Sequence, residues 1–196
     1  MITIKVEEVR KVACVGAGTI GSAWAAYFLS RGLEVVATDP ALEAETRLRA
    51  NIDEAWPKLE RLGLSTDANR EKLSFIKDVK QAVTQVDFIQ ESAPDEEALK
   101  IDLISKIDAY CRNDVVISSS SSYFLPSRLA SACKYPERVI VGHPFVPAYL
   151  VPLVEVVGGS STPVEILDWA VDFYRLIGKR PLKLKKEIEG YIANRC

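Results

Sequence analysis

The sequence predicts an α/β fold of the Rossmann type, with a doubly wound and mostly parallel sheet. Three observations lead to this prediction. Short apolar runs alternate with amphipathic stretches, a glycine-rich turn follows the first run, and an acidic residue ends the second. With 196 residues, 48% of them hydrophobic and 27% charged, the chain is long enough for one substantial domain with its own core.

The first two strands and the helix between them follow from local patterns. Residues 12–15 form an apolar run that ends at a glycine, as a buried parallel strand does. A helix with one apolar face is predicted next, and Gly32 is expected to cap its C-terminus. The apolar positions of this helix are Ile20, Ala23, Trp24, Tyr27 and Phe28. Residues 34–39 predict a second strand, which the Asp39-Pro40 pair ends.

The remaining chain continues the alternation. A long amphipathic segment follows, with an expected apolar face of Leu48, Ile52, Ala55, Leu59 and Leu62. Further strands are predicted near residues 74–76, 87–90, 115–117, 139–141 and 153–157. Helices are predicted at residues 96–110 and 163–176. Residues 118–122 are five serines that directly follow a strand, so we expect them to form a loop.

Charge and composition exclude several classes of function. The formal net charge of −2 gives no basic field for nucleic acid. No apolar run reaches the ~20 residues of a membrane span, and the first residues do not form a signal peptide. Cysteine spacings match no zinc or redox pattern, so we expect reduced thiols, no metal site and a cytoplasmic protein. The cysteines are Cys14, Cys111, Cys133 and Cys196.

The glycine-rich turn has the features of a dinucleotide site. Gly16, Gly18 and Gly21 allow a sharp turn, a close approach to a pyrophosphate and the packing of a helix whose N-terminus faces the phosphates. Asp39 ends the second strand and is expected to accept the ribose hydroxyls. No arginine follows Asp39 at once, which favours NAD over NADP. The alternative is a glycine-rich turn without a ligand, but the strand, helix and acid around it favour NAD.

The only histidine suggests a base. His143 follows the predicted strand at residues 139–141, and ligands of open α/β sheets bind beyond the carboxyl ends of strands. Glu155 is an isolated carboxylate in an apolar strand, where an unpaired charge is costly. A His143–Glu155 pair would satisfy the carboxylate and make a general base. A core histidine and a solvent-facing glutamate are equally compatible with the pattern.

Six segments in order carry a resemblance to a known family. They are residues 16–21, the segment Glu91-Ser92-Ala93-Pro94, the serine run, Gly142-His143-Pro144-Phe145, residues 152–156 and residues 190–195. Together they resemble the L-3-hydroxyacyl-CoA dehydrogenase family, and within it the L-carnitine dehydrogenases. The resemblance covers nearly the whole chain.

The resemblance implies roles for individual residues. His143 would be the general base, Glu155 would orient it, Ser122 would bind the substrate oxygen, and Asn194 would lie near the substrate. NAD would be the cofactor and would contact Gly16, Gly18, Thr19, Ile20, Gly21, Asp39, Ser92, Ala93, Asp95, Lys100 and Ser120. The reaction would be the reversible oxidation of a secondary 3-hydroxyl group, in which His143 takes the proton and NAD the hydride.

The sequence also departs from the pattern of the family. Val146 stands where family members have asparagine, so one polar contact beside the base is lost. Family enzymes continue beyond residue 196 into a helical domain that forms a homodimer. We therefore expect an NAD-binding domain at residues 1–187 and the start of a truncated helical domain at residues 188–196.

The substrate stays open between a carnitine-like compound and an acyl-CoA. Phe145, Tyr149, Tyr123 and Phe124 flank the expected site and would suit a trimethylammonium group, but core or surface roles are favoured for them. A basic group at Lys183, Lys185 and Lys186 is interpreted as a solvated sheet edge. A non-catalytic NAD-binding module, a crystallin-like structural protein and a lysine-based hydroxy acid dehydrogenase are the alternatives. The His143 to Glu155 spacing speaks against the lysine-based enzyme.

Overall fold

The computed structural model describes residues 4–195, so residues 1–3 and Cys196 lie outside the description. Its strands are β1 Lys11–Val15, β2 Glu34–Thr38, β3 Leu73–Phe75, β4 Phe88–Glu91, β5 Val116–Ser119, β6 Val139–Pro144, β7 Leu153–Gly158 and β8 Arg180–Lys183. Its α-helices are α1 Thr19–Ser30, α2 Ala44–Leu62, α3 Val79–Val83, α4 Glu97–Tyr110, α5 Pro126–Leu129 and α6 Val164–Leu176. Short 3-10 helices are η1 Val6–Glu8, η2 Arg70–Lys72, η3 Pro136–Arg138 and η4 Ala193–Arg195.

All of the described strands form one sheet, in the order β3-β2-β1-β4-β5-β6-β7-β8. Neighbouring strands are parallel except at β6 and β7, which pair in the antiparallel sense. The prediction of a doubly wound, mostly parallel sheet is therefore confirmed. The chain runs outward from β1 to β2 and β3, then returns to β4 on the other side of β1. This reversal leaves a crevice between β1 and β4 at their carboxyl ends, where such sheets bind ligands.

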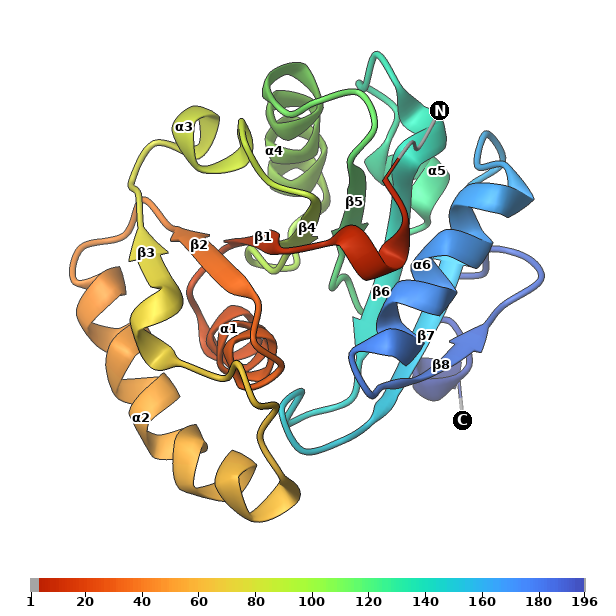
Figure 1. The fold of residues 1–196 in the computed structure, drawn as a ribbon. Coiled ribbons are helices and arrows are strands. Elements are labelled where there is room, and N and C mark those ends of the chain that lie inside the picture. The colour runs from red at the N-terminus through yellow and green to blue at the C-terminus, as the bar shows by residue number, and fades with distance from the viewer. Residues whose placement is uncertain (1–3, 196) are drawn as a thin grey trace.

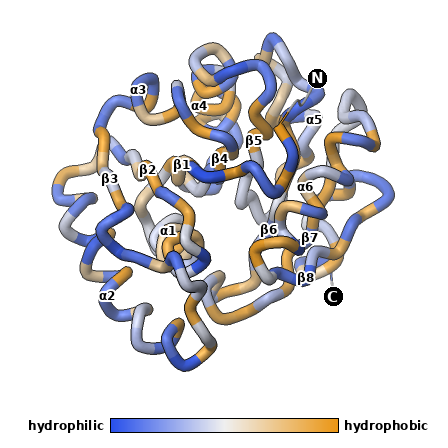
Figure 2. The backbone as a smooth tube through the Cα atoms, in the orientation of Figure 1, coloured by the Kyte–Doolittle hydropathy of each residue, from blue (hydrophilic) through white to orange (hydrophobic). Residues whose placement is uncertain are grey.

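Helices cover both faces of the sheet, and each face has its own core (Figure 1). On one face, α1 and α6 pack on alternate strand residues such as Val12, Phe88 and Ile140, and α2 packs on the outside of α1. On the other face, α3, α4 and α5 pack on the intervening residues such as Ala13 and Ile89. The alternation arises because successive strand residues point to opposite faces. Figure 2 shows the outer helix α2 alternating between hydrophilic and hydrophobic residues, as a half-buried helix must.

The structure corrects the sequence-based description at three places. Leu62 was expected on the buried face of α2, but 58% of it is exposed because α2 ends there and projects into open space at Gly63. The first two serines of the expected loop, Ser118 and Ser119, belong to β5 and pair with β4. His143 lies within β6 instead of after it, because the antiparallel pairing with β7 extends β6 to Pro144.

Candidate active site

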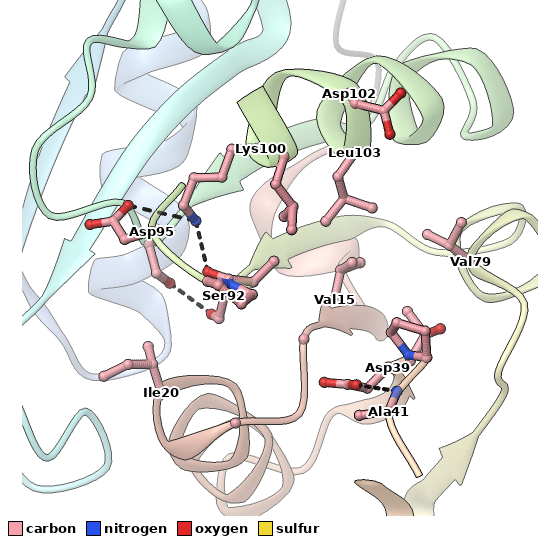
Figure 3. Close-up of a pocket in the computed structure, with 18 of the residues that line it drawn as sticks. Val15, Ile20, Asp39, Ala41, Val79, Ser92, Asp95, Lys100, Asp102 and Leu103 are labelled. Atoms are coloured by element: carbon pink, nitrogen blue, oxygen red, sulfur yellow. Dashed lines mark hydrogen bonds and ion pairs between the residues drawn. The ribbon is translucent and has the colours of Figure 1, made fainter. Parts of the chain in front are cut away.

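A cleft of about 740 Å³ opens at the carboxyl ends of β1, β2, β4 and β5. Figure 3 shows Asp39 at one end of the view and Asp95 and Lys100 at the other, with Ser92 between them. Of the residues predicted to bind the cofactor, all except Gly21 line this cleft, and Ser122 also lines it. The fold thus brings together residues that are up to about a hundred positions apart in the sequence.

The glycine turn between β1 and α1 forms the floor of the cleft. Gly16 has φ of +96°, and a Cβ there would lie 2.7 Å from the carbonyl carbon of Ser92. A Cβ on Gly21 would lie 1.8 Å from the Gly16 oxygen, so Gly16 permits close packing of the turn on the loop after β4 and Gly21 permits close packing of α1 on the turn. At Gly18, by contrast, a Cβ would meet no protein atom within 4 Å. The middle glycine therefore leaves open space, which fits the close approach of a pyrophosphate to the N-terminus of α1.

Asp39 lies directly after β2 and closes one end of the cleft. Its Oδ2 accepts a hydrogen bond from the Ala17 amide at 2.7 Å, and its Oδ1 accepts one from the Ala41 amide at 2.8 Å. These bonds fix the carboxylate against the glycine turn while it lines the cleft. Each carboxylate oxygen retains acceptor capacity, so Asp39 can also accept a ribose hydroxyl. This geometry and the open space at Gly18 fit an NAD cofactor.

A buried ion pair supports the other end of the cleft. The Lys100 ammonium lies 2.9 Å from Glu91 Oε1 and also donates to the Ala93 carbonyl at 3.0 Å. Glu91 accepts further hydrogen bonds from the Ala93 amide and the Ser119 hydroxyl. Lys100 and Glu91 are 1% and 0% exposed, so the pair holds the loop after β4 in place. The sequence reasoning placed Lys100 at the cofactor and did not assign Glu91, although a glutamate at the end of an apolar strand is a signal that a partner exists.

The serine loop after β5 is tied to the loop after β4 through Asp95. The Ser121 hydroxyl donates to Asp95 Oδ1 at 3.0 Å, and the Ser122 amide donates to Asp95 Oδ2 at 3.1 Å. Ser122 is exposed at the edge of the cleft, while Ser121 is buried. Asp95 therefore positions the loop that carries Ser122.

His143 and Glu155 face each other across the antiparallel pair β6–β7. His143 Nδ1 lies 2.9 Å from Glu155 Oε2, and the two residues are 8% and 1% exposed. No group within residues 4–195 is bonded to His143 Nε2. A carboxylate that accepts from Nδ1 fixes the tautomer and leaves Nε2 free to accept a proton.

Residues at the start of η4 complete the surroundings of the histidine. Glu155 Oε1 accepts from the amides of Ile192 at 2.9 Å and Ala193 at 3.2 Å. The Asn194 side chain donates to the Ser122 carbonyl at 2.8 Å. Asn194 thus connects the His143 region to the edge of the cleft, although neither His143 nor Asn194 lines the cleft itself.

The aromatic and basic residues considered for substrate binding have other contacts. None of the four aromatic residues lines the cleft. The Tyr149 hydroxyl accepts from Lys58 at 3.1 Å and the lysine lies over its ring, while Tyr123 donates to Glu189. Phe145 remains beside the histidine, with ring centroids 5.7 Å apart. Lys183 is exposed at the edge strand β8, as expected for a solvated edge.

Three further features of residues 4–195 concern metal binding, membrane crossing and the state of the cysteine thiols. Within residues 4–195, no group of three or more His, Cys, Asp or Glu side chains is arranged to hold a metal ion. None of the helices in that range has the length and apolar character that a membrane crossing requires. Cys14, Cys111 and Cys133 are free, and burial raises the pKa of each thiol.

Comparison with known proteins identifies a family that matches most of this chain. Residues 11–188 match the family described as 3-hydroxyacyl-CoA dehydrogenase, NAD binding domain. An L-carnitine dehydrogenase of Nocardiopsis dassonvillei is 50% identical over 189 residues, which are 96% of this chain and 57% of that protein. An L-carnitine dehydrogenase of Burkholderia mallei is 47% identical over 190 residues, which are 97% of this chain and 59% of that protein. The chain therefore spans less than two thirds of these relatives.

Solved structures agree with this match. The NAD⁺-dependent 5-formyl-3-hydroxy-2-methylpyridine 4-carboxylic acid 5-dehydrogenase aligns with a TM-score of 0.89 and 31% identity, over 95% of this chain and 61% of that one. The 3-hydroxybutyryl-CoA dehydrogenase of Escherichia coli aligns with a TM-score of 0.87 and 28% identity, over 96% of this chain and 40% of that one.

Proposed function

The chain belongs to the 3-hydroxyacyl-CoA dehydrogenase family, whose NAD-binding domain it contains, and from this membership we propose its function. It is the cofactor-binding part of an NAD-dependent dehydrogenase that oxidises the 3-hydroxyl group of an L-3-hydroxy acid or its derivative. The product is the corresponding 3-oxo compound. The observation that carries this proposal is the buried His143–Glu155 pair, which residues 192–194 connect to Ser122 at the edge of the cleft.

His143, Glu155 and Ser122 have separate roles in the reaction. His143 Nε2 accepts the proton of the substrate hydroxyl, because its Nδ1 is already held by Glu155. Glu155 is buried and stabilises the imidazolium that forms. The Ser122 hydroxyl, exposed at the cleft edge, donates to the substrate oxygen. When bound, NAD would accept the hydride that leaves the carbon bearing the hydroxyl group, as the C–O bond of that carbon becomes C=O.

The substrate is a 3-hydroxy compound of carnitine type or of 3-hydroxyacyl-CoA type. Relatives that are about half identical to this chain bear the name L-carnitine dehydrogenase, which supports the carnitine type. The structural likeness to a 3-hydroxybutyryl-CoA dehydrogenase supports the same chemistry on a thioester. NADH formation from L-carnitine and from 3-hydroxybutyryl-CoA by the full-length protein decides between them. A full-length protein that turns over neither compound contradicts the substrate proposal.

The role of His143 is tested by its replacement with alanine. Loss of the base lowers turnover by about 100- to 10,000-fold, the usual contribution of general base catalysis. NAD affinity of the chain stays within about twofold of wild type, because His143 does not line the cleft. Steady-state kinetics of the full-length protein and calorimetric titration of the chain measure the two quantities. An equal loss of both indicates that His143 has a structural role.

A second candidate function is a non-catalytic NAD-binding module. Val146, next to the histidine motif, is 64% exposed and offers no hydrogen-bonding side chain where the family pattern has a polar one. The module still binds NAD through the same cleft. Titration that shows NAD binding to the chain, together with no turnover by the full-length protein, favours this second function.

The full-length protein is further proposed to be a cytoplasmic homodimer. The free thiols of Cys14, Cys111 and Cys133 support a reducing compartment. Val146 and Ile192, which flank the histidine pair, are apolar and 64% and 48% exposed, which supports association through this region. Light scattering of the full-length protein and of the chain tests the proposal, and a strictly monomeric mass at high concentration contradicts it.

A further inference from the structure

Five polar side chains form a buried line of hydrogen bonds between α6 and the cleft. Ser118 lies 2.8 Å from the Tyr174 hydroxyl, which lies 2.6 Å from Gln90 Oε1. Gln90 Nε2 donates to the Ser120 hydroxyl at 2.8 Å, and Ser120 lies 2.9 Å from the Ser92 hydroxyl. We call this line the relay. Its first three members are completely buried, while Ser120 and Ser92 line the cleft.

The direction of the bonds in the buried part of the relay is fixed by chemistry. Burial raises the pKa of Tyr174, so the phenol is neutral and has one hydrogen to donate. Gln90 Oε1 can only accept, so the Tyr174 hydrogen is committed to it. Ser118 must then donate to the Tyr174 oxygen.

The orientation of the Gln90 amide follows from a second neighbour. Gln90 Nε2 lies 3.5 Å from the Gly142 carbonyl as well as 2.8 Å from Ser120. A flipped amide would place its oxygen against the Gly142 oxygen, and two acceptors would face each other without a hydrogen. The amide hydrogens therefore point to Ser120 and Gly142, and Ser120 is an acceptor in the relay.

The two hydroxyls at the cleft are left with one unused hydrogen. Because Ser120 accepts from Gln90, its own hydrogen is free to reach Ser92 or the cleft. If Ser120 donates to Ser92, the Ser92 hydrogen is unused, and if Ser92 donates, the Ser120 hydrogen is unused. Among residues 4–195 no other acceptor is bonded to either hydroxyl. In both arrangements the pair offers one O–H donor to the cleft.

The strand that carries His143 is adapted to the relay. A Cβ on Gly142 would lie 2.2 Å from the Tyr174 hydroxyl and 2.5 Å from the Ser118 hydroxyl. Only glycine leaves room for this junction, directly before His143 in β6. The relay is therefore built into the strands β4, β5 and β6 instead of being a chance contact on the surface.

We propose that the relay orients the Ser92–Ser120 pair as a hydrogen-bond donor to the carboxamide oxygen of the nicotinamide ring of bound NAD. Ser92 and Ser120 follow β4 and β5, across the crevice from Asp39 and towards β6 with His143. In a dinucleotide site this half takes the nicotinamide if Asp39 takes the adenosine ribose. The carboxamide oxygen is an acceptor without a hydrogen, which matches a hydroxyl pair that has one hydrogen to donate. Gln90 and Tyr174 are positioning residues, and the inference rests on the proposed function.

The test compares two ligands on the 196-residue chain by calorimetric titration. NAD carries the nicotinamide ring, and ADP-ribose is the same molecule without it. Tyr174→Phe removes the donor that holds Gln90 Oε1, and Gln90→Met removes the amide while keeping its approximate size. Each variant weakens NAD binding by about three- to tenfold, the effect of one hydrogen bond, and leaves ADP-ribose binding within about twofold. The 3-acetylpyridine analogue of NAD retains the carbonyl oxygen and shows the same loss as NAD.

The control is Tyr27→Phe. Tyr27 in α1 is also buried, and its hydroxyl donates to the Ile177 carbonyl at the end of α6 at 2.8 Å, outside the relay. This variant loses one buried hydrogen bond and keeps the wild-type ratio of NAD to ADP-ribose affinity. Circular dichroism melting establishes that each variant is folded. If Tyr174→Phe does not fold, the test relies on Gln90→Met alone.

The outcomes separate the two proposals. Binding of both ligands by the wild-type chain with an unchanged ratio in both relay variants overturns the inference and leaves the proposed function standing. An equal loss for NAD and ADP-ribose assigns the donor to the ribose and also overturns it. If the wild-type chain binds neither ligand, the proposed function fails and the inference fails with it.

Discussion

The three glycines of the turn after β1 differ in what requires them. Gly16 and Gly21 are required by the protein itself, whereas the space above Gly18 is empty of protein atoms. We predict that Gly18→Ala weakens NAD binding at least about tenfold while changing the free energy of unfolding by less than about 1 kcal/mol. The added methyl group takes space needed by the pyrophosphate and displaces nothing in the protein. Calorimetric titration and urea unfolding measure the two effects.

Gly21→Ala is the matched comparison for this prediction. Its methyl group would lie 1.8 Å from the Gly16 oxygen, so α1 must move and the protein is destabilised by about 1–3 kcal/mol or more. The two variants introduce the same group three residues apart, one into open space and one into backbone. Equal stability losses for Gly18→Ala and Gly21→Ala would contradict the assignment of the open space to a ligand.

At the scale of elements, Glu155 joins β6, β7 and the segment that leads into η4. One carboxylate oxygen holds His143, and the other accepts from the amides of Ile192 and Ala193. We predict that Glu155→Gln lowers turnover of the full-length protein at least about tenfold, because a glutamine has one acceptor oxygen for two acceptor roles. Hydrogen exchange at the Ile192 or Ala193 amide also becomes faster, since the glutamine cannot hold both the histidine and the segment.

Glu187→Gln provides the control for Glu155→Gln. The Glu187 carboxylate also accepts from two donors, the Ser127 amide at 3.0 Å and the Ser127 hydroxyl at 2.6 Å. It makes no contact with His143, so its replacement leaves turnover at the wild-type value. Unchanged turnover in Glu155→Gln, or an equal loss in Glu187→Gln, would argue against an orienting role for Glu155.

Elements defined by local patterns were predictable from the sequence. The glycine spacing, the apolar run of β1 and the acid after β2 all lie within about 30 residues, and each is governed by local geometry. The length of β6 was not predictable, because its last three residues, including His143, pair only with β7. The contact of His143 with Glu155 was proposed from the isolated carboxylate, but only the register of β6 and β7 sets them opposite each other.

The parts of the site that the sequence did not reveal depend on distant partners. The relay joins Gln90 to Tyr174, 84 residues apart, and a buried glutamine in a strand carries no local signal of its partner. Lys100 is predicted to contact the cofactor. In the structure its ammonium donates to Glu91 and to the Ala93 carbonyl, and lies 4.0 Å from Asp95. The cofactor-binding residues that the resemblance names line one cleft, except Gly21, whereas the internal partners of Lys100 could be found only from the three-dimensional arrangement.

At the scale of the whole molecule, a buried lysine connects α1 with the loop between β6 and β7. Lys179 is 4% exposed, and its ammonium donates to the carbonyls of Val151, at 3.0 Å, and Ala148. It lies 3.7 Å from the centre of the Tyr27 ring, and among residues 4–195 no carboxylate is within 4.0 Å. Burial, and to a smaller extent the charge of Arg31, lowers the pKa of Lys179 to about 7. The carbonyls and the aromatic ring compensate only part of the cost of burying the charge.

This buried charge predicts that stability increases as the pH rises above neutrality. Below about pH 7 the lysine is protonated in both states, so the folded protein bears the full cost of the buried charge. Between about pH 7 and the ordinary lysine pKa of about 10.4, the folded state loses the proton while the unfolded state keeps it. The free energy of unfolding therefore rises over this range, by at most about 1.4 kcal/mol per pH unit.

Lys179→Met isolates this contribution from the other groups that titrate in the same range. The methionine fills a similar volume without a charge, so its pH dependence lacks the rise due to Lys179. Urea unfolding of both proteins between about pH 7 and pH 9 gives the two slopes, and the wild-type curve should be the steeper. The comparison of slopes does not depend on the absolute stability of the variant, because loss of the hydrogen bonds to Ala148 and Val151 shifts its free energy of unfolding by the same amount at every pH. Parallel curves would mean that Lys179 keeps its proton throughout, and that the carbonyls and the Tyr27 ring compensate its burial completely.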